Sequence, residues 1–188
     1  AETSGIAGGA SVMLGNGDVD GYAGGAITYY DSKYGIPAPG NPANPVHIDM
    51  HQTKVQLASE LEFNDGPFSA LGLTGGYSDY SHGEVDATGA TGSRFDNEEW
   101  EGRAELLHRA VGPFTGAFGI QARKRDMEAA GEGGELLAPT TTEAIAAFLF
   151  EEMPLAGERL KLQLGGRIEQ VEVSGRALDA SIPLAPTD

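Results

Sequence analysis

The most regular feature of the chain is an alternation of apolar and polar side chains near its middle. Val55, Leu57 and Leu61 fall on one side of this stretch, and charged or amide side chains fall on the other. A period of two places successive side chains on opposite faces of a β-strand. The turn-forming sequence Asn64-Asp65-Gly66-Pro67 follows, and a second alternating run returns to Tyr80. The two runs predict a hairpin with strands of about fifteen residues, whereas strands of globular proteins average about five or six.

Similar runs along the rest of the chain predict about eight strands in total. The predicted strands cover residues 11–14, 22–30, 47–63, 68–80, 93–109, 114–123, 140–153 and 160–169. Short connections are predicted at 15–18, 64–67, 111–113 and 155–158, and long ones at 33–46, 83–92, 128–139 and beyond 174. Because short and long connections alternate, the tight turns gather at one end of an up-and-down antiparallel sheet and the long loops at the other.

This arrangement predicts an all-β fold, specifically an antiparallel up-and-down transmembrane β-barrel segment. Outer-membrane barrels have short periplasmic turns and long extracellular loops, and their strands alternate apolar outward with polar inward. Only a closed sheet satisfies the backbone hydrogen bonds of strands in lipid. The charges of Glu101, Arg103 and Glu105 suit the inner face of a wet lumen. A soluble antiparallel sheet with one solvated face is the alternative, and strand length and loop asymmetry favour the barrel.

Composition narrows the partners and the chemistry that we expect. The 188 residues include 28 glycines, which is typical of a β-rich chain with many turns. There are no cysteines, so disulfides and thiolate metal sites are excluded. The formal net charge of −16 repels nucleic acid phosphates, and we therefore expect no nucleic acid partner. No catalytic constellation or phosphate-binding glycine loop stands out, which predicts no enzyme activity and no cofactor.

Four side chains are candidates for contact with a ligand. Tyr29, Tyr30 and Tyr34 lie where a predicted strand meets the first long loop, and His82 lies at the next such strand end. Tyrosine combines a flat apolar ring with a hydroxyl group, which suits it to ligand binding. The same property suits tyrosine to a belt at the membrane interface, so both interpretations stay open.

A second group of side chains combines imidazole and carboxylate at strand spacing. His47, Asp49 and His51 alternate along one face of a predicted strand, and His82 and Glu84 repeat the spacing at the next long loop. Imidazole and carboxylate together bind Zn²⁺ or a similar metal. The alternative is that these residues are polar strand ends that face a wet lumen.

Five segments carry a resemblance to a known family through their order and spacing. They cover residues 29–37, 46–54, 75–82, 95–106 and 139–142. The third of them, Gly75-Gly76-Tyr77-Ser78-Asp79-Tyr80-Ser81-His82, is similar to the strand-end pattern Gly-Tyr-Thr-Asp-Tyr-x-His. Together the segments resemble the strands and loop entries of TonB-dependent outer-membrane receptors over about residues 15–173.

The resemblance implies a barrel of about 22 strands with a plugged lumen. Residues 1–188 are then expected to be a partial β-barrel domain that lacks the plug domain and the remaining strands. It also implies a receptor of the Gram-negative outer membrane that imports a scarce nutrient, most often an iron–siderophore or other metal chelate. Its partners are TonB, the receptor's own plug domain, outer-membrane lipid and the chelate. A small self-closed eight-strand outer-membrane barrel with a structural or adhesive role is the alternative, and a soluble ligand-binding β-barrel is a third.

Overall fold

The computed structural model describes residues 1–15, 19–36, 45–135, 137–155 and 159–175. These residues form eight strands and one short 3-10 helix. The strands are β1 (Glu2–Gly15), β2 (Val19–Ile36), β3 (Val46–Phe63), β4 (Phe68–Val85), β5 (Thr91–Val111), β6 (Phe114–Gly131), β7 (Thr140–Leu155) and β8 (Leu160–Gly175), and the helix is η1 (Glu132–Glu135). No helix in the described ranges is long and apolar enough to cross a membrane.

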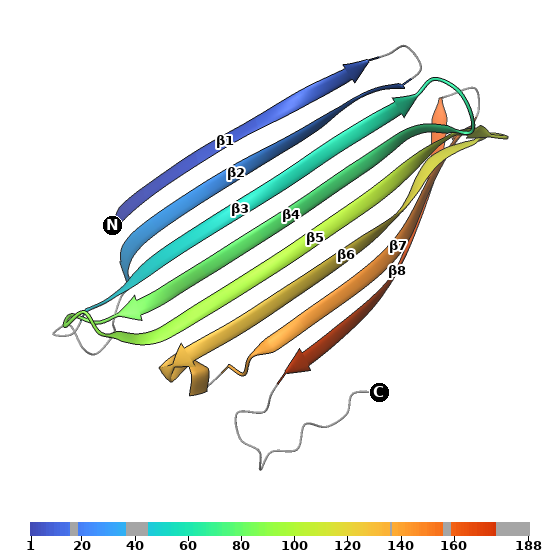
Figure 1. Ribbon diagram of the computed structural model, residues 1–188. Helices are drawn as coiled ribbons and strands as arrows, with labels where there is room; N and C mark the ends of the chain where they lie inside the picture. The colour runs from blue at the N-terminus through green and yellow to red at the C-terminus, as the bar shows by residue number, and fades with distance from the viewer. Residues whose placement is uncertain (16–18, 37–44, 136, 156–158, 176–188) are drawn as a thin grey trace.

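All eight strands join one antiparallel sheet in the order of the sequence (Figure 1). Each strand therefore pairs with the strands that precede and follow it in the chain. β2 and β3 pair without interruption, from Val19 with Phe63 to Ile36 with Val46. The predicted all-β, up-and-down antiparallel fold is confirmed.

The strands are longer than the side-chain alternation predicts. The sequence predicts only a weak first strand at 11–14, whereas β1 pairs with β2 from Glu2 to Gly15. Glycine and alanine contribute little to a hydrophobic pattern, but their backbone groups complete the ladder as those of other residues do. β4 and β6 likewise continue to Val85 and Gly131. The loops predicted at 83–92 and 128–139 are therefore shorter than expected.

Two of the predicted tight turns are present at the same end of the sheet. Gly66 has a φ of 87° and Gly112 a φ of 63°, values that favour glycine. Arg109 stabilises the first turn, because its Nε donates to the carbonyl oxygen of Gly66 at 3.1 Å and its backbone N–H donates to that of Pro67 at 2.8 Å. Most of each turn predicted at 15–18 and 155–158, and most of the proline-rich loop, lie outside the described residues.

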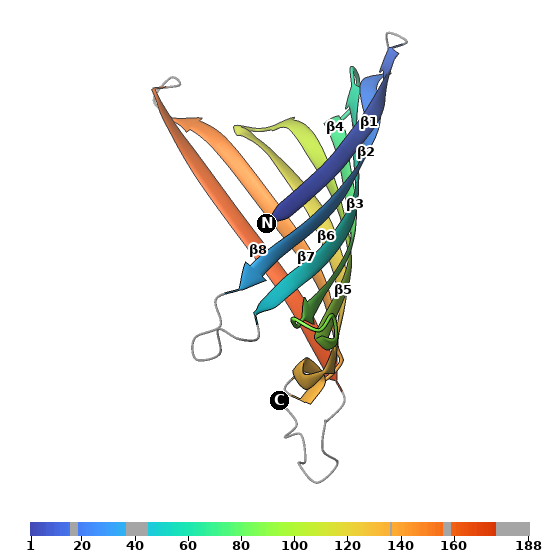
Figure 2. The same cartoon turned by 90° about the vertical axis from the view of Figure 1, so that its left-hand side faces the viewer.

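The sheet curves into a trough (Figure 2), and its two surfaces differ in chemistry. We call the concave surface the inner face and the convex surface the outer face. All of the buried side chains in the described ranges lie on the inner face, including Ser32 and Ala146, and that face also carries charged residues such as Arg103. Leu57 and Ile120 lie on the outer face and are 59% and 58% exposed, so none of the described residues covers them. The predicted alternation of polar inward with apolar outward is therefore present.

The sheet has two unpaired edges, one along β1 and one along β8. No ladder joins these two strands within the described ranges. A small self-closed eight-strand barrel requires such a ladder, so the structure does not support that alternative. A curved sheet with two open edges is the geometry of one wall of a larger barrel.

Candidate functional site

Aromatic side chains gather on the inner face near the long-loop end of the sheet. We call this group the aromatic site, and it consists of Tyr30, Tyr34, Tyr80, His82 and Phe95. Tyr30 and Tyr80 lie in one cross-strand row, two strands apart. His82 pairs with Phe95 in the next row towards the loops, and Tyr34 lies one row beyond. Long-range strand pairing thus brings together rings from three strands.

Ring contacts hold the centre of the aromatic site. The imidazole of His82 stacks on the ring of Phe95, with 4.7 Å between the ring centroids and 16° between the planes. The ring of Tyr80 meets the same imidazole edge-on at 5.5 Å. The Nδ1 atom of His82 is buried and has no hydrogen-bond partner among the described residues. Because an unpaired buried polar atom is costly, this nitrogen favours a ligand that supplies a partner.

A hollow of mixed polar and apolar lining continues from the aromatic site towards the middle of the inner face. Its volume is about 860 Å³, which is within the range of small-molecule pockets. Lys54, Ser78 and Glu99 are among the side chains that line it, and Gly76 is one of several small residues there. Ser78 lies two positions from Tyr80 on the same face of β4, so the hollow and the aromatic site are continuous.

The loop between β4 and β5 is organised around the carboxylate of Asp86. Its Oδ1 accepts hydrogen bonds from the hydroxyl and the backbone N–H of Thr88, at 2.7 and 2.8 Å, and from the N–H of Ala90 at 3.0 Å. The bond from the Thr88 hydroxyl, followed by those from the backbone, holds the pKa of Asp86 below its ordinary value. This loop joins the strands that carry His82 and Phe95, and therefore helps to set the register in which their rings meet.

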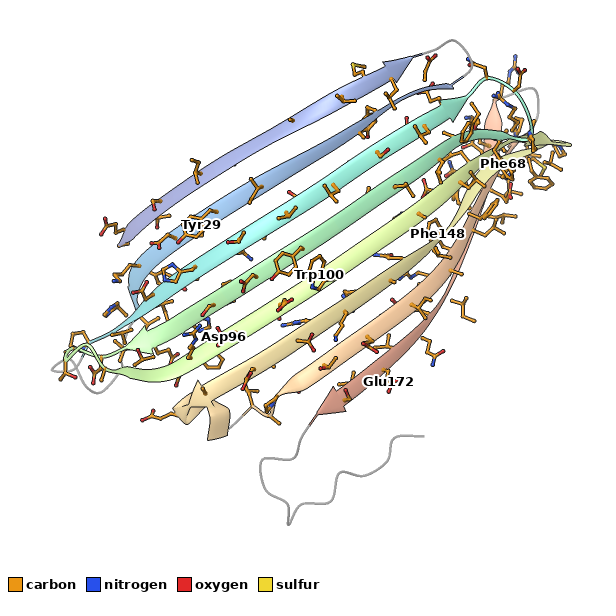
Figure 3. All side chains as sticks on the ribbon, in the orientation of Figure 1. Tyr29, Phe68, Asp96, Trp100, Phe148 and Glu172 are labelled. Atoms are coloured by element: carbon orange, nitrogen blue, oxygen red, sulfur yellow. The ribbon has the colours of Figure 1, made fainter. Side chains whose placement is uncertain are left out.

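Three of the four predicted ligand-contact residues lie in the aromatic site, namely Tyr30, Tyr34 and His82. Tyr29 lies on the outer face instead (Figure 3), and its hydroxyl is 3.4 Å from Nδ1 of His51. Successive residues of a strand face opposite ways, so Tyr29 cannot share a site with Tyr30. Ligand contact by the three inner residues stays a prediction.

The residues predicted to bind a metal are divided between the two faces. His47, Asp49 and His51 share the outer face, whereas His82 and Glu84 lie on the inner face. The interpretation of the first three as polar strand ends that face a lumen is therefore wrong. They lie on the same face of β3 as the apolar Val55 and Leu57, nearer the long-loop end of the strand.

Two of the three outer-face members of this set, Asp49 and His51, already have partners of their own. The Oδ2 atom of Asp49 is 2.9 Å from Nζ of Lys33, and Nδ1 of His51 is 2.8 Å from Oδ2 of Asp31. In the part of the chain that the structure describes, no group of three or more histidine or acidic side chains is arranged to hold a metal ion. The five predicted ligands do not form one metal site in this structure.

Tyr80 and Phe95 belong to the aromatic site although the sequence patterns do not select them for it. Tyr80 lies two positions from His82, and both alternate with the apolar Leu73. The alternation of β4 alone therefore places Tyr80 on the same face as His82. Phe95 lies an even number of positions from Glu99 and Glu101, so the alternation of β5 also places it on the inner face, but its pairing with His82 depends on the register between β4 and β5, which the alternation alone does not fix.

The eight-stranded wall has a counterpart among known protein families. The family model described as TonB dependent receptor-like, beta-barrel matches residues 4–185, from β1 to beyond the end of β8. No curated protein matches the chain. The family match covers nearly the whole sequence, and its β-barrel architecture agrees with the open, curved antiparallel sheet. The chain therefore belongs to the TonB-dependent receptor family, and its match is to the family's β-barrel.

Proposed function

We propose that this chain forms part of the wall of a receptor that imports an iron–siderophore or related metal chelate across the Gram-negative outer membrane. The family consists of outer-membrane receptors and transporters, and its barrels act together with TonB and a plug domain. The nutrient is a metal chelate, and it binds at the aromatic site and in the hollow beside it.

The observation that supports this assignment is the aromatic site at the long-loop end of the inner face. A ligand that enters from the loop side meets these rings before it reaches the hollow. The rings of Tyr80 and Phe95 suit planar or aromatic parts of a chelate, and Nδ1 of His82 offers one unused hydrogen-bond position. Lys54 and Glu99 then provide charged contacts within the hollow.

Replacement of Phe95 by alanine tests the proposed ligand site. The change removes the ring that stacks on His82. An aromatic contact is worth about 0.5–1.5 kcal/mol, so we expect chelate binding to weaken by about two- to tenfold. The measurement is binding and uptake of radiolabelled ferric chelates by cells in which the full-length receptor is the only route of entry.

Tyr29→Ala is the matched control, because it removes an aromatic ring at the same end of the sheet but from the outer face. We expect its uptake to equal that of the unmodified receptor. Equal losses in both variants, at equal amounts of receptor in the membrane, would contradict the proposed site. Phe95-dependent uptake of a metal-free nutrient would keep the site but overturn the proposed ligand class.

A further inference from the structure

Arg125 on β6 places a guanidinium group on the inner face, one row from the aromatic site. Its Nε atom donates to Oδ1 of Asn97, and its Nη2 atom lies 3.9 Å from Sδ of Met127. No salt bridge joins this guanidinium to an acidic side chain of the described residues. Asn97 pairs with Tyr80 on β4, so Arg125 is held beside the aromatic site.

These two contacts leave one end of the Arg125 guanidinium open. Nη1 donates to none of the described residues, so it is available to a ligand. The fork formed by Nη1 and Nη2 matches two oxygens of one anionic group, which it binds through two parallel hydrogen bonds. Arg125 is exposed, so a ligand can reach this fork. Thr142, the partner of Arg125 on β7, adds a hydroxyl donor on the same face.

The carboxylates beside Arg125 border a different space from its fork. Glu99 is the partner of Arg125 on β5, and Glu101 is the partner of Arg123 in the next row towards the short turns. Both glutamates line the hollow of about 860 Å³, which lies towards β4, and Arg125 does not line it. Oε1 of Glu101 also accepts a hydrogen bond from Nε2 of Gln121 at 2.8 Å. Two guanidinium groups therefore balance two carboxylates here, and the fork of Arg125 stays open.

The other charged groups of the long-loop half lie on the outer face or several spacings away. Acidic residues with even numbers on β5 and β6, such as Asp126, point to the outer face. Glu84 lies three rows nearer the loops, roughly 20 Å along the strands, and Glu132 lies beyond the end of β6. Lys54 lies three strands away, roughly 14 Å. Exposed charges are screened beyond about 8 Å at physiological ionic strength, so none of these groups prevents an anion from binding at Arg125.

We propose that the fork of Arg125 binds two oxygens of the imported chelate and thereby selects a ferric catecholate. This inference rests on the proposed function and adds the class of the chelate. A tris-catecholate complex is negatively charged, and its oxygens occur in adjacent pairs, each on a flat aromatic ring. The oxygen pairs suit Arg125, and the rings suit Tyr80 and Phe95. A ferric tris-hydroxamate is uncharged and needs no such ring, so it should bind less tightly.

Equilibrium binding to the purified full-length receptor that contains this chain tests the inference. The probes are a ferric tris-catecholate and a ferric tris-hydroxamate, both labelled with radioactive iron. We expect the catecholate to bind more tightly. Arg125→Gln removes the charge and the fork, and should weaken catecholate binding roughly tenfold while changing hydroxamate binding by less than about twofold. Arg125→Lys keeps the charge but loses the fork, so its catecholate affinity should lie between those of the unmodified receptor and Arg125→Gln.

Arg167→Gln is the matched control, because Arg167 is another inner-face arginine whose guanidinium already has partners. Its Nη1 atom donates to Oε1 of Gln121 at 2.9 Å, and its Nη2 atom donates to Oε1 of Glu169 at 2.8 Å. Catecholate binding by this variant should equal that of the unmodified receptor. Raised salt should weaken catecholate binding more in the unmodified receptor than in Arg125→Gln, because salt screens the guanidinium charge.

The possible results separate this inference from the proposed function. If the receptor binds both chelates but Arg125→Gln weakens the two equally, or Arg167→Gln weakens catecholate binding as much, the role of Arg125 is overturned and the proposed function stands. Tighter binding of the hydroxamate than of the catecholate would likewise overturn only the class of the chelate. Binding of neither chelate would overturn the proposed function and this inference with it.

Discussion

At the scale of single residues, Asp86 shows how one side chain can shape the ligand end of the wall. Its carboxylate accepts three hydrogen bonds within a loop that joins the strands of the aromatic site. These bonds are made to the charged form, which is why the pKa of Asp86 lies below its ordinary value. The loop is therefore more ordered when Asp86 is ionised.

The order of this loop should depend on pH in a predictable direction. Because the pKa is lowered in the folded state, the stabilising bonds are fully present above the ordinary carboxyl pKa of about 3.9 and are lost as the pH falls through the folded pKa. We expect the amides of Thr88 and Ala90 to be protected from hydrogen exchange near neutral pH. Their protection should fall several-fold once Asp86 is protonated, as measured by exchange mass spectrometry across a pH series.

Asp86→Asn is the control, because asparagine keeps a side-chain oxygen that accepts hydrogen bonds but does not titrate. Protection of the same amides should then be weaker than in the unmodified chain and independent of pH in this range. A pH dependence that survives the substitution would assign the effect to another group.

At the scale of elements, β6 allows its two neighbours to touch across it. The guanidinium of Arg103 on β5 lies 3.9 Å from the ring centroid of Phe148 on β7. The space for this contact comes from Gly119, because a Cβ there would collide with the Phe148 ring and with the carbonyl oxygen of Ala104. A missing side chain on one strand thus lets a charged group and a ring meet on the inner face.

Gly119→Ala should therefore destabilise the wall. The added methyl group must push aside either the ring or the backbone, and overpacking of this kind costs about 1–3 kcal/mol. Thermal unfolding of the purified full-length receptor measures the loss. Gly76→Ala serves as the control, since a Cβ at Gly76 has its nearest neighbour, the carbonyl oxygen of Val55, at 3.9 Å. Equal stability of the two variants would contradict the role assigned to Gly119.

The elements also show how far the sequence predicts the structure. Alternating side chains and turn residues predict the meander and the hairpin at Gly66, because both depend on local chemistry. The same alternation, extended past the apolar middle of β3, would have placed His51 outward. The predicted length of β1 is too short because glycine and alanine side chains are too small to show an alternation. The meeting of His82 with Phe95 depends on the register between β4 and β5, which is unbroken from Ala70 to Glu84, and the register between two strands has no local signature.

At the scale of the whole molecule, the two open edges are the dominant feature. β1 and β8 each expose one row of backbone N–H and C=O groups, which is a template for pairing with another strand. Residues 1–188 produced alone and refolded in detergent micelles should therefore associate into dimers and larger species. Size-exclusion chromatography with light scattering measures this association.

The full-length receptor in the same micelles is the comparison, because further barrel strands should pair with both edges there. We expect it to stay monomeric. A well-folded monomer of the isolated segment would contradict this prediction, since that is the behaviour of a small self-closed barrel.

The uninterrupted ladder between β2 and β3 has a mechanical consequence. When a force acts along the strand axis, the hydrogen bonds of this antiparallel ladder share the load, and all of them must break before one strand can slide past the other. Side-chain contacts on the inner face can instead break one after another, each at a low force. A force applied to a polypeptide segment bound inside the trough should therefore detach that segment at a lower force than is needed to separate β2 from β3.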